Sequence, residues 1–199
     1  MDLIVYLQIA FVSFIINIVP AFMPPTWLVL SISKVNYPSL NTFAIAAFGV
    51  LGSLTGRYVM YYYSKFLGKY IKEGHKKNVY YFRKLVGSNN VAVFLMTLIY
   101  SLGPVPSNFL FISFGLSEIK LLPVLLGFSI GRFVSYVLLI DVSFQAFSYL
   151  SLFVNVNGAR IIADILGIFF AVIIVFVKWE KLYLFIEKLK VKKANKNRI

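Results

Sequence analysis

The chain lacks cysteine and carries little charge for its length. No Cys occurs among its 199 residues, which excludes disulfides, thiolate metal sites and cysteine nucleophiles. Only 14% of the residues are charged, whereas about a quarter are charged in soluble domains. Asp and Glu number 7, and there is a single His. Because no paired carboxylates, metal-ligand cluster or catalytic triad can be recognised, we predict neither an enzyme nor a metal or cofactor site.

Apolar residues take the place of the missing charge. They make up 60% of the chain, and the mean hydropathy is +0.83. A fold of this size cannot bury so many apolar side chains in its interior, because small domains have a high ratio of surface to volume. Lipid as the surrounding solvent removes that difficulty. The composition therefore predicts an all-α polytopic membrane protein with one membrane domain.

The net charge of +13 is concentrated beside the apolar runs. Fifteen of the twenty Lys and Arg lie in two blocks, 65–84 and 178–198. Basic blocks that flank membrane spans mark the cytoplasmic side. A nucleic-acid-binding protein would instead carry a basic face on a soluble domain, so we expect no nucleic-acid partner. The predicted location is the cell membrane, multi-pass, with the basic loop 65–90 and the C-terminal tail in the cytoplasm.

The apolar runs differ in their ability to cross a membrane. They cover 3–19, 27–32, 40–63, 91–102, 109–116, 121–144 and 161–177, and 148–157 reads as a polar turn. The run 91–102 is too short for a hydrocarbon core of about 30 Å, which takes about 20 helical residues. It ends at Gly-Pro-Val-Pro, 103–106, and proline breaks helices.

The charges decide how these runs cross. If both basic blocks are cytoplasmic, an even number of crossings separates them, and the last two runs already supply two. Segment 91–116 must then enter and leave on the same side, as a re-entrant hairpin with its tip at 103–106. Segment 3–32 has the same form, with prolines at 20–25, and this places the N-terminus outside; a full crossing by 3–19 is the alternative. The irregular backbone at such a tip must be covered by protein or line a water-filled cavity, because lipid cannot satisfy its hydrogen bonds.

Two stretches of the sequence resemble each other. Residues 52–61 read GSLTGRYVMY and residues 127–136 read GFSIGRFVSY. Each half thus combines a proline-tipped hairpin with a span carrying Gly-x-x-x-Gly-Arg. Because each half crosses once, the second begins on the opposite side, which is the inverted repeat of many secondary transporters. Chance similarity within an apolar chain is the alternative.

The predicted organisation follows from this repeat. A single transmembrane domain covers 1–178, with repeat halves of re-entrant helical hairpin plus transmembrane helix at about 3–65 and 90–147. An additional C-terminal transmembrane helix covers 160–178, and a basic cytoplasmic tail covers 179–199. Small residues spaced by four let helix backbones approach closely, so we predict helix packing at Gly49, Gly52, Gly56, Gly127 and Gly131.

Arg57 and Arg132 follow the two glycine motifs inside predicted spans. A charge there costs at least about 2.5–3.5 kcal/mol, so it requires compensation. The intramembrane carboxylates, Asp141 and Asp164, lie near the outer end, where Arg160 is their natural partner. Because guanidinium groups suit bidentate phosphate recognition, we hypothesise that Arg57 and Arg132 bind the phosphate of a lipid or another anion. The alternatives are bonds to free carbonyls at the hairpin tips, or snorkelling.

The hairpin tips supply the other candidate substrate-binding residues. Hydroxyls, an amide and helix N-termini at these tips could bind an anion. The alternative is that the polar residues cap the helical pieces that follow. The candidates are Pro25, Thr26, Pro104, Pro106, Ser107 and Asn108.

These motifs resemble those of the DedA family, also called VTT-domain or SNARE-associated Golgi proteins. The resemblance covers about 15–178 and rests on the prolines at 20–25, the glycines of 49–68, and the segments 104–115 and 127–136. It implies two facing re-entrant hairpins and a flippase or scramblase that moves lipid, of phospholipid or polyprenyl-phosphate type, between leaflets. The implied partners are membrane lipids with anionic head groups, and a homo-oligomer is left open.

The chain departs from the bacterial members of that family in its charges. Those proteins carry acidic residues in the first hairpin and near the first glycine motif, whereas no Asp or Glu occurs here between Leu3 and Lys72. Ser53 stands near the second position, and the arginines that the family has in the second hairpin are missing, with Tyr100 and Asn108 nearby. Scrambling without an energy source, or another coupling ion, fits this absence better than proton coupling. A small-solute exporter and a non-transporting membrane scaffold are the alternative functions.

Overall fold

The computed structural model describes residues 2–20, 23–70, 89–103 and 107–153, and positions 86, 158 and 165. Its regular elements within these ranges are six helices: α1 Asp2–Ile18, α2 Thr26–Asn36, α3 Thr42–Gly68, α5 Asn90–Leu102, α6 Asn108–Leu116 and α7 Leu121–Phe153. The prediction of an all-α chain is confirmed for this part. The predicted last span, 160–178, apart from position 165, the tail, 179–199, and most of the loop 65–90 lie outside the described residues.

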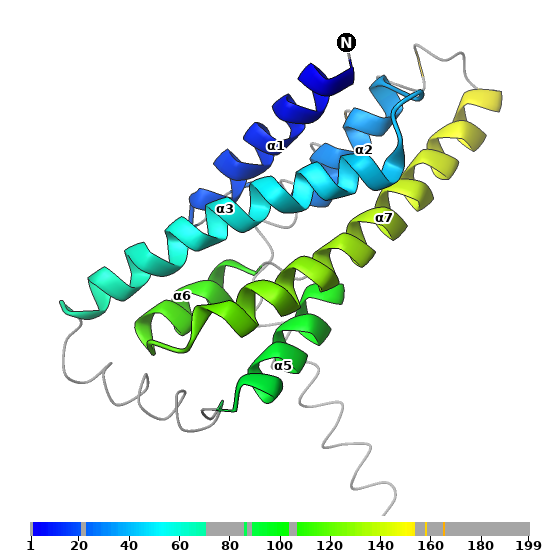
Figure 1. Cartoon of the computed structure of the whole chain (residues 1–199). Coiled ribbons are helices and arrows are strands. Elements are labelled where there is room, and N and C mark those ends of the chain that lie inside the picture. Colours follow the sequence, from blue (N-terminus) through cyan, green and yellow to red (C-terminus); the bar gives the residue numbers. More distant parts are fainter. Residues whose placement is uncertain are drawn as a thin grey trace, which may run out of the picture.

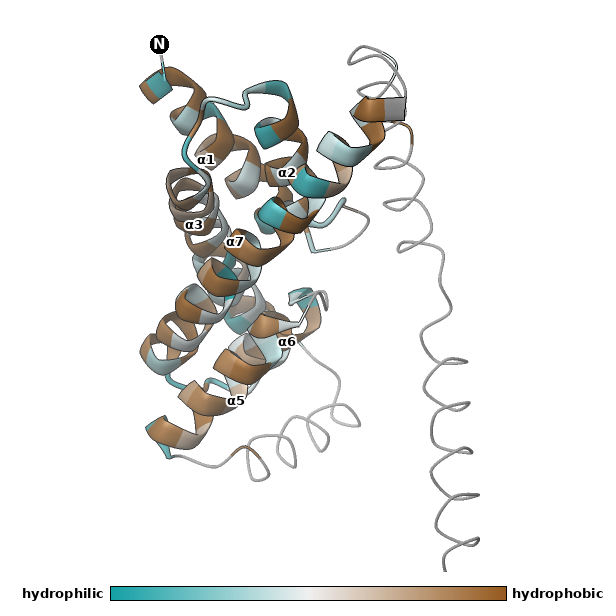
Figure 2. Ribbon diagram, turned by 90° about the vertical axis from the view of Figure 1, so that its right-hand side faces the viewer, coloured by the Kyte–Doolittle hydropathy of each residue, from teal (hydrophilic) through white to brown (hydrophobic). Residues whose placement is uncertain are grey.

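Two of the described helices, α3 and α7, are long and apolar enough to cross a membrane. They have 27 and 33 residues, or about 40 and 50 Å at 1.5 Å per residue. They run in opposite directions (Figure 1), and near their middles the hydroxyls of Ser53 on α3 and Tyr136 on α7 are 3.2 Å apart. Hydrophobic residues predominate along the described helices (Figure 2).

The shorter helices form two hairpins at opposite ends of the long pair. The α1–α2 hairpin lies beside the beginning of α3, and the α5–α6 hairpin lies beside the beginning of α7 (Figures 1 and 2). The first helix of each hairpin packs along the long helix of its own half, α1 on α3 and α5 on α7. The second helix packs on the long helix of the other half, α2 on α7 and α6 on α3. The two halves are therefore interlocked.

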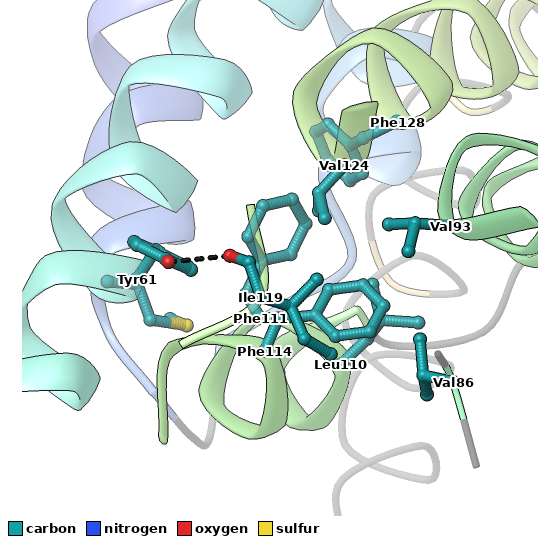
Figure 3. Close-up of a cluster of buried hydrophobic side chains, with 10 residues drawn as sticks. Tyr61, Val86, Val93, Leu110, Phe111, Phe114, Ile119, Val124 and Phe128 are labelled. Carbon is teal, nitrogen blue, oxygen red and sulfur yellow. Dashed lines mark hydrogen bonds between the residues drawn. The ribbon is translucent and has the colours of Figure 1, made fainter. Parts of the chain in front are cut away.

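Two clusters of buried apolar side chains lie toward the two ends of the bundle. The first, shown in Figure 3, joins α3, α5, α6 and α7 and includes Phe111, Phe114 and Phe128. In this cluster the Tyr61 hydroxyl donates to the carbonyl of Ile119 at 2.7 Å. The second cluster joins α1, α2, α3 and α7 and consists of Ile9, Leu30, Leu40, Ile45, Ala46, Val50, Tyr136 and Ile140. Polar side chains fill the middle of the bundle between these two clusters.

The helix α7 is longer than the sequence predicted. A polar turn was expected over 148–157, but α7 continues to Phe153, so that prediction is wrong for 148–153. The segment from Asp141 onward contains no Gly or Pro before residue 153. The hydroxyls of Ser148 and Ser151 bond to carbonyls of the same helix at 2.9 and 2.7 Å, which keeps serine compatible with a helix. Residues 154–157 lie outside the described part.

Candidate functional site

The glycines of the first half let α1 lie directly against α3. A Cβ on Gly56 would lie 2.8 Å from the Phe14 carbonyl oxygen and from Asn17 Cβ, and a Cβ on Gly52 would collide with the Ala10 carbonyl. Backbone atoms cannot rotate away, so only glycine permits this approach. Gly49 differs, because the added atom would meet the Leu30 side chain of α2 at 2.6 Å.

The second half repeats this contact between α5 and α7. A Cβ on Gly127 would lie 2.5 Å from the Phe94 carbonyl oxygen, and one on Gly131 would lie 2.7 Å from the Leu98 carbonyl oxygen. Small polar residues four apart face the glycine pairs: Ser13 and Asn17 on α1, Thr97 and Ser101 on α5. Sequence reasoning missed these partners, although their spacing of four in otherwise apolar runs was a readable signal.

The arginines that follow the glycine motifs are both buried, with 5% of Arg57 and 6% of Arg132 exposed. Arg57 Nη1 donates to the Asn17 carbonyl at 3.2 Å, and Arg132 Nη1 donates to the Gly103 carbonyl at 3.1 Å. Both carbonyls lie at the end of the first helix of a hairpin. The alternative of carbonyl binding is therefore realised in the structure, and these bonds anchor each hairpin turn to its long helix.

Aromatic rings surround the two guanidinium groups. Arg57 Cζ lies 5.9 Å from the centre of the Phe111 ring, and Arg132 Cζ lies 5.7 Å from that of Phe128. The Tyr136 ring is 6.0 Å from Arg132 Cζ. Such ring faces attract cations and exclude water, which strengthens electrostatic interactions at this place.

The guanidinium of Arg57 is incompletely satisfied. Among the described residues its hydrogen-bond acceptors are the Asn17 carbonyl and the weak acceptor Met60 Sδ, at 3.3 Å, and its buried Nε has no hydrogen-bond partner there. No carboxylate of the described residues acts on it; the groups within electrostatic range are Arg132, Tyr100 and Tyr136. A buried charge without a counter-charge is costly, so an anion would be stabilised beside Arg57.

A chain of neutral polar groups joins the helices around the arginines. The Asn17 amide nitrogen lies within hydrogen-bond distance of three acceptors that share its two N–H groups: the Ser13 carbonyl at 2.8 Å, Thr26 Oγ1 at 2.8 Å and Ser53 Oγ at 3.1 Å. Ser53 Oγ and the Tyr136 hydroxyl are 3.2 Å apart. This network connects α1, α2, α3 and α7, and with the two arginines it forms the layer that we call the polar layer.

Of the predicted tip residues, Thr26 belongs to the polar layer. Pro25 precedes α2 and Ser107 precedes α6, and neither makes a side-chain cap. Thr26 accepts from Asn17, and Asn108 Nδ2 donates to the Pro20 carbonyl at 2.8 Å, so the two hairpin turns touch. The capping alternative is therefore wrong for these polar residues. The predicted Pro104 and Pro106 lie outside the described residues.

Chemically, the polar layer offers hydrogen-bond donors and positive charge but no acid, base or nucleophile set. Within the described ranges no group of three or more His, Cys, Asp or Glu could hold a metal ion. No protein-family model matches the chain, and no curated protein or solved structure is significantly similar to it. The function must therefore be inferred from the residues themselves.

Proposed function

We propose that the chain is a multi-pass protein of the cell membrane, in which α3 and α7 span the bilayer and both hairpins are re-entrant. The outer faces of the helices expose large apolar side chains such as Ile99, Leu122 and Leu138. Water would make such a surface aggregate, whereas lipid solvates it. α1 and α5 have 17 and 13 residues and turn back in the middle of the bundle, which supports hairpins rather than crossings.

The inverted repeat belongs to the same proposal. Its support is the opposite direction of α3 and α7, the matching glycine contacts, and the matching bonds from Arg57 and Arg132 to hairpin carbonyls. The positive-inside rule then puts the loop 65–90 and the tail in the cytoplasm. In such proteins the substrate site lies near the midplane, where the broken elements meet.

The proposed activity is movement of lipid between the two leaflets, as by a flippase or scramblase, with the phosphate of an anionic head group held by the arginines. The observation that carries this is Arg57, a buried guanidinium that has no carboxylate partner and no acceptor for its Nε within the described part of the chain, and that lies within electrostatic range of a second arginine. Phosphate oxygens are acceptors that match the guanidinium fork. They would provide the counter-charge that the described residues lack.

The proposed path lies between the interlocked halves. The hydrogen bonds from Arg57 to the Asn17 carbonyl and from Arg132 to the Gly103 carbonyl are 3.2 and 3.1 Å long, which is long for charged donors. The phosphate of a head group that enters the polar layer would replace these carbonyls as the acceptor. The acyl chains would stay in the surrounding hydrocarbon. Separation of the hairpin turns would also break the bond from Asn108 to the Pro20 carbonyl.

Reconstitution of the purified chain into liposomes tests this function. Fluorescent anionic lipid is placed in one leaflet, and its accessibility to a membrane-impermeant quencher is followed. We expect the two leaflets to equalise faster than in protein-free liposomes. Uptake of a soluble solute with no lipid movement would instead show an exporter, and the absence of both activities would leave a scaffold.

A further inference from the structure

We infer that Asn17 determines which head groups the polar layer accepts, because its neutral amide keeps the layer positively charged. This inference rests on the proposed lipid transport. Asn17 is 2% exposed, and its carbonyl receives Arg57 Nη1. Its Cβ also lies against Gly56, which directly precedes Arg57 in α3.

The charge of the polar layer discriminates between head groups. Two buried guanidinium groups attract a phosphate that has no cation of its own. They repel the ammonium of a zwitterionic head group, which must enter the same space with its phosphate. The Coulomb energy between two unit charges several ångströms apart in a protein corresponds to a change of more than tenfold in a binding constant. The layer therefore favours anionic over zwitterionic lipid as long as its other polar groups are neutral.

Asp in place of Asn17 is a nearly isosteric change that removes this preference. A carboxylate would accept hydrogen bonds from the hydroxyls of Thr26 and Ser53, so these two contacts persist with the donor reversed. The bond to the Ser13 carbonyl is lost and becomes a repulsive contact between two acceptor oxygens, which lowers stability without removing the added charge. The new charge neutralises one of the two arginines, and an ammonium group then finds a counter-charge inside the layer.

Asp at position 26 is an independent way to place the same charge. Thr and Asp are similar in size, and Thr26 Oγ1 already accepts from the Asn17 amide at 2.8 Å. Position 26 is the first residue of α2, where the helix dipole favours a carboxylate. Thr26→Asp therefore tests the charge without disturbing Asn17.

The experiment measures the exchange of two lipids in the same liposomes, one with a phosphatidylglycerol head group and one with a phosphatidylcholine head group. We expect the ratio of anionic to zwitterionic exchange rates to fall about tenfold or more in Asn17→Asp and in Thr26→Asp. Asn36→Asp, which makes the same chemical change at the exposed end of α2, should keep the wild-type ratio. Asn17→Leu should slow both lipids equally, because it removes the network without adding charge.

The outcomes separate the inference from the function it rests on. Thermal unfolding in detergent identifies the folded variants. If Asn17→Asp does not fold, the exchange ratio of Thr26→Asp tests the inference instead. A wild-type ratio in a folded Asp variant overturns the role of Asn17 while lipid transport stands. Wild-type protein that moves neither lipid overturns the proposed function itself.

Discussion

Replacement of Gly52 by alanine tests how closely α1 lies against α3. The added methyl group would collide with the Ala10 carbonyl and lie 2.8 Å from Ser13 Cβ. The carbonyl belongs to a helix backbone and cannot rotate away, so α1 must shift as a unit. Overpacking of this kind costs about 3 kcal/mol at the upper end of its usual range, and the better helix propensity of alanine returns about 1 kcal/mol. We therefore expect a net destabilisation of about 2 kcal/mol.

Thermal unfolding in detergent micelles, followed by tryptophan fluorescence, measures this cost. For a chain of this size about 2 kcal/mol corresponds to a Tm lower by roughly 4–8 °C. Gly68→Ala is the matched control, because its Cβ would meet only Leu116, at 3.7 Å, which is ordinary contact. The control should keep the wild-type Tm or raise it. If Gly52→Ala unfolds at or above the Tm of Gly68→Ala, the close contact of α1 with α3 is refuted.

Two further substitutions test the end of the second hairpin. Glu118 has φ 51° directly after α6, a conformation that costs a side chain about 1–2 kcal/mol and glycine nothing, so Glu118→Gly should stabilise the protein by about 1 kcal/mol. A lower Tm for this variant would contradict the left-handed turn. Tyr61→Phe removes the bond to the buried Ile119 carbonyl and should cost about 1–2 kcal/mol, whereas Tyr63→Phe, on the exposed face, should cost nothing measurable. Equal Tm values for the two phenylalanine variants would show that the Tyr61 bond does not form.

The short helices of the second hairpin were predictable because their ends are encoded locally. The apolar runs 91–102 and 109–116 stop at glycine and proline, and the structure has α5 and α6 at Asn90–Leu102 and Asn108–Leu116. The end of α7 was not predictable by the same rule. Serine reads as a turn former in a sequence, yet within a long helix its hydroxyl bonds to a carbonyl of the preceding turn.

The polar layer was only partly predictable. Arg57 and Arg132 stand out because charge is rare in an apolar segment, and this rarity can be recognised from the sequence alone. Ser53 does not stand out, because single uncharged polar residues are common in such segments, and Asn17 is marked only by its spacing of four from Ser13. Their role depends on which helices meet, and the packing of α2 on α7 and of α6 on α3 is set by contacts distant in sequence.

Gly115 shows a further limit of the sequence pattern. It lies outside the Gly-x-x-x-Gly motifs, yet a Cβ there would be 2.5 Å from the Tyr61 carbonyl oxygen. This contact lets α6 cross α3 closely, and it joins the two halves of the chain. A lone glycine carries no spacing from which such a partner could be inferred.

The most direct test of the buried arginines as an anion site is leaflet exchange of anionic lipid by the double variant Arg57→Gln, Arg132→Gln. Lys120→Gln, at an exposed position, controls for the loss of positive charge. If the arginines bind the head-group phosphate, the folded double variant loses exchange of anionic lipid, and the control keeps the wild-type rate. A folded double variant that moves every anionic lipid tested at the wild-type rate would contradict the account.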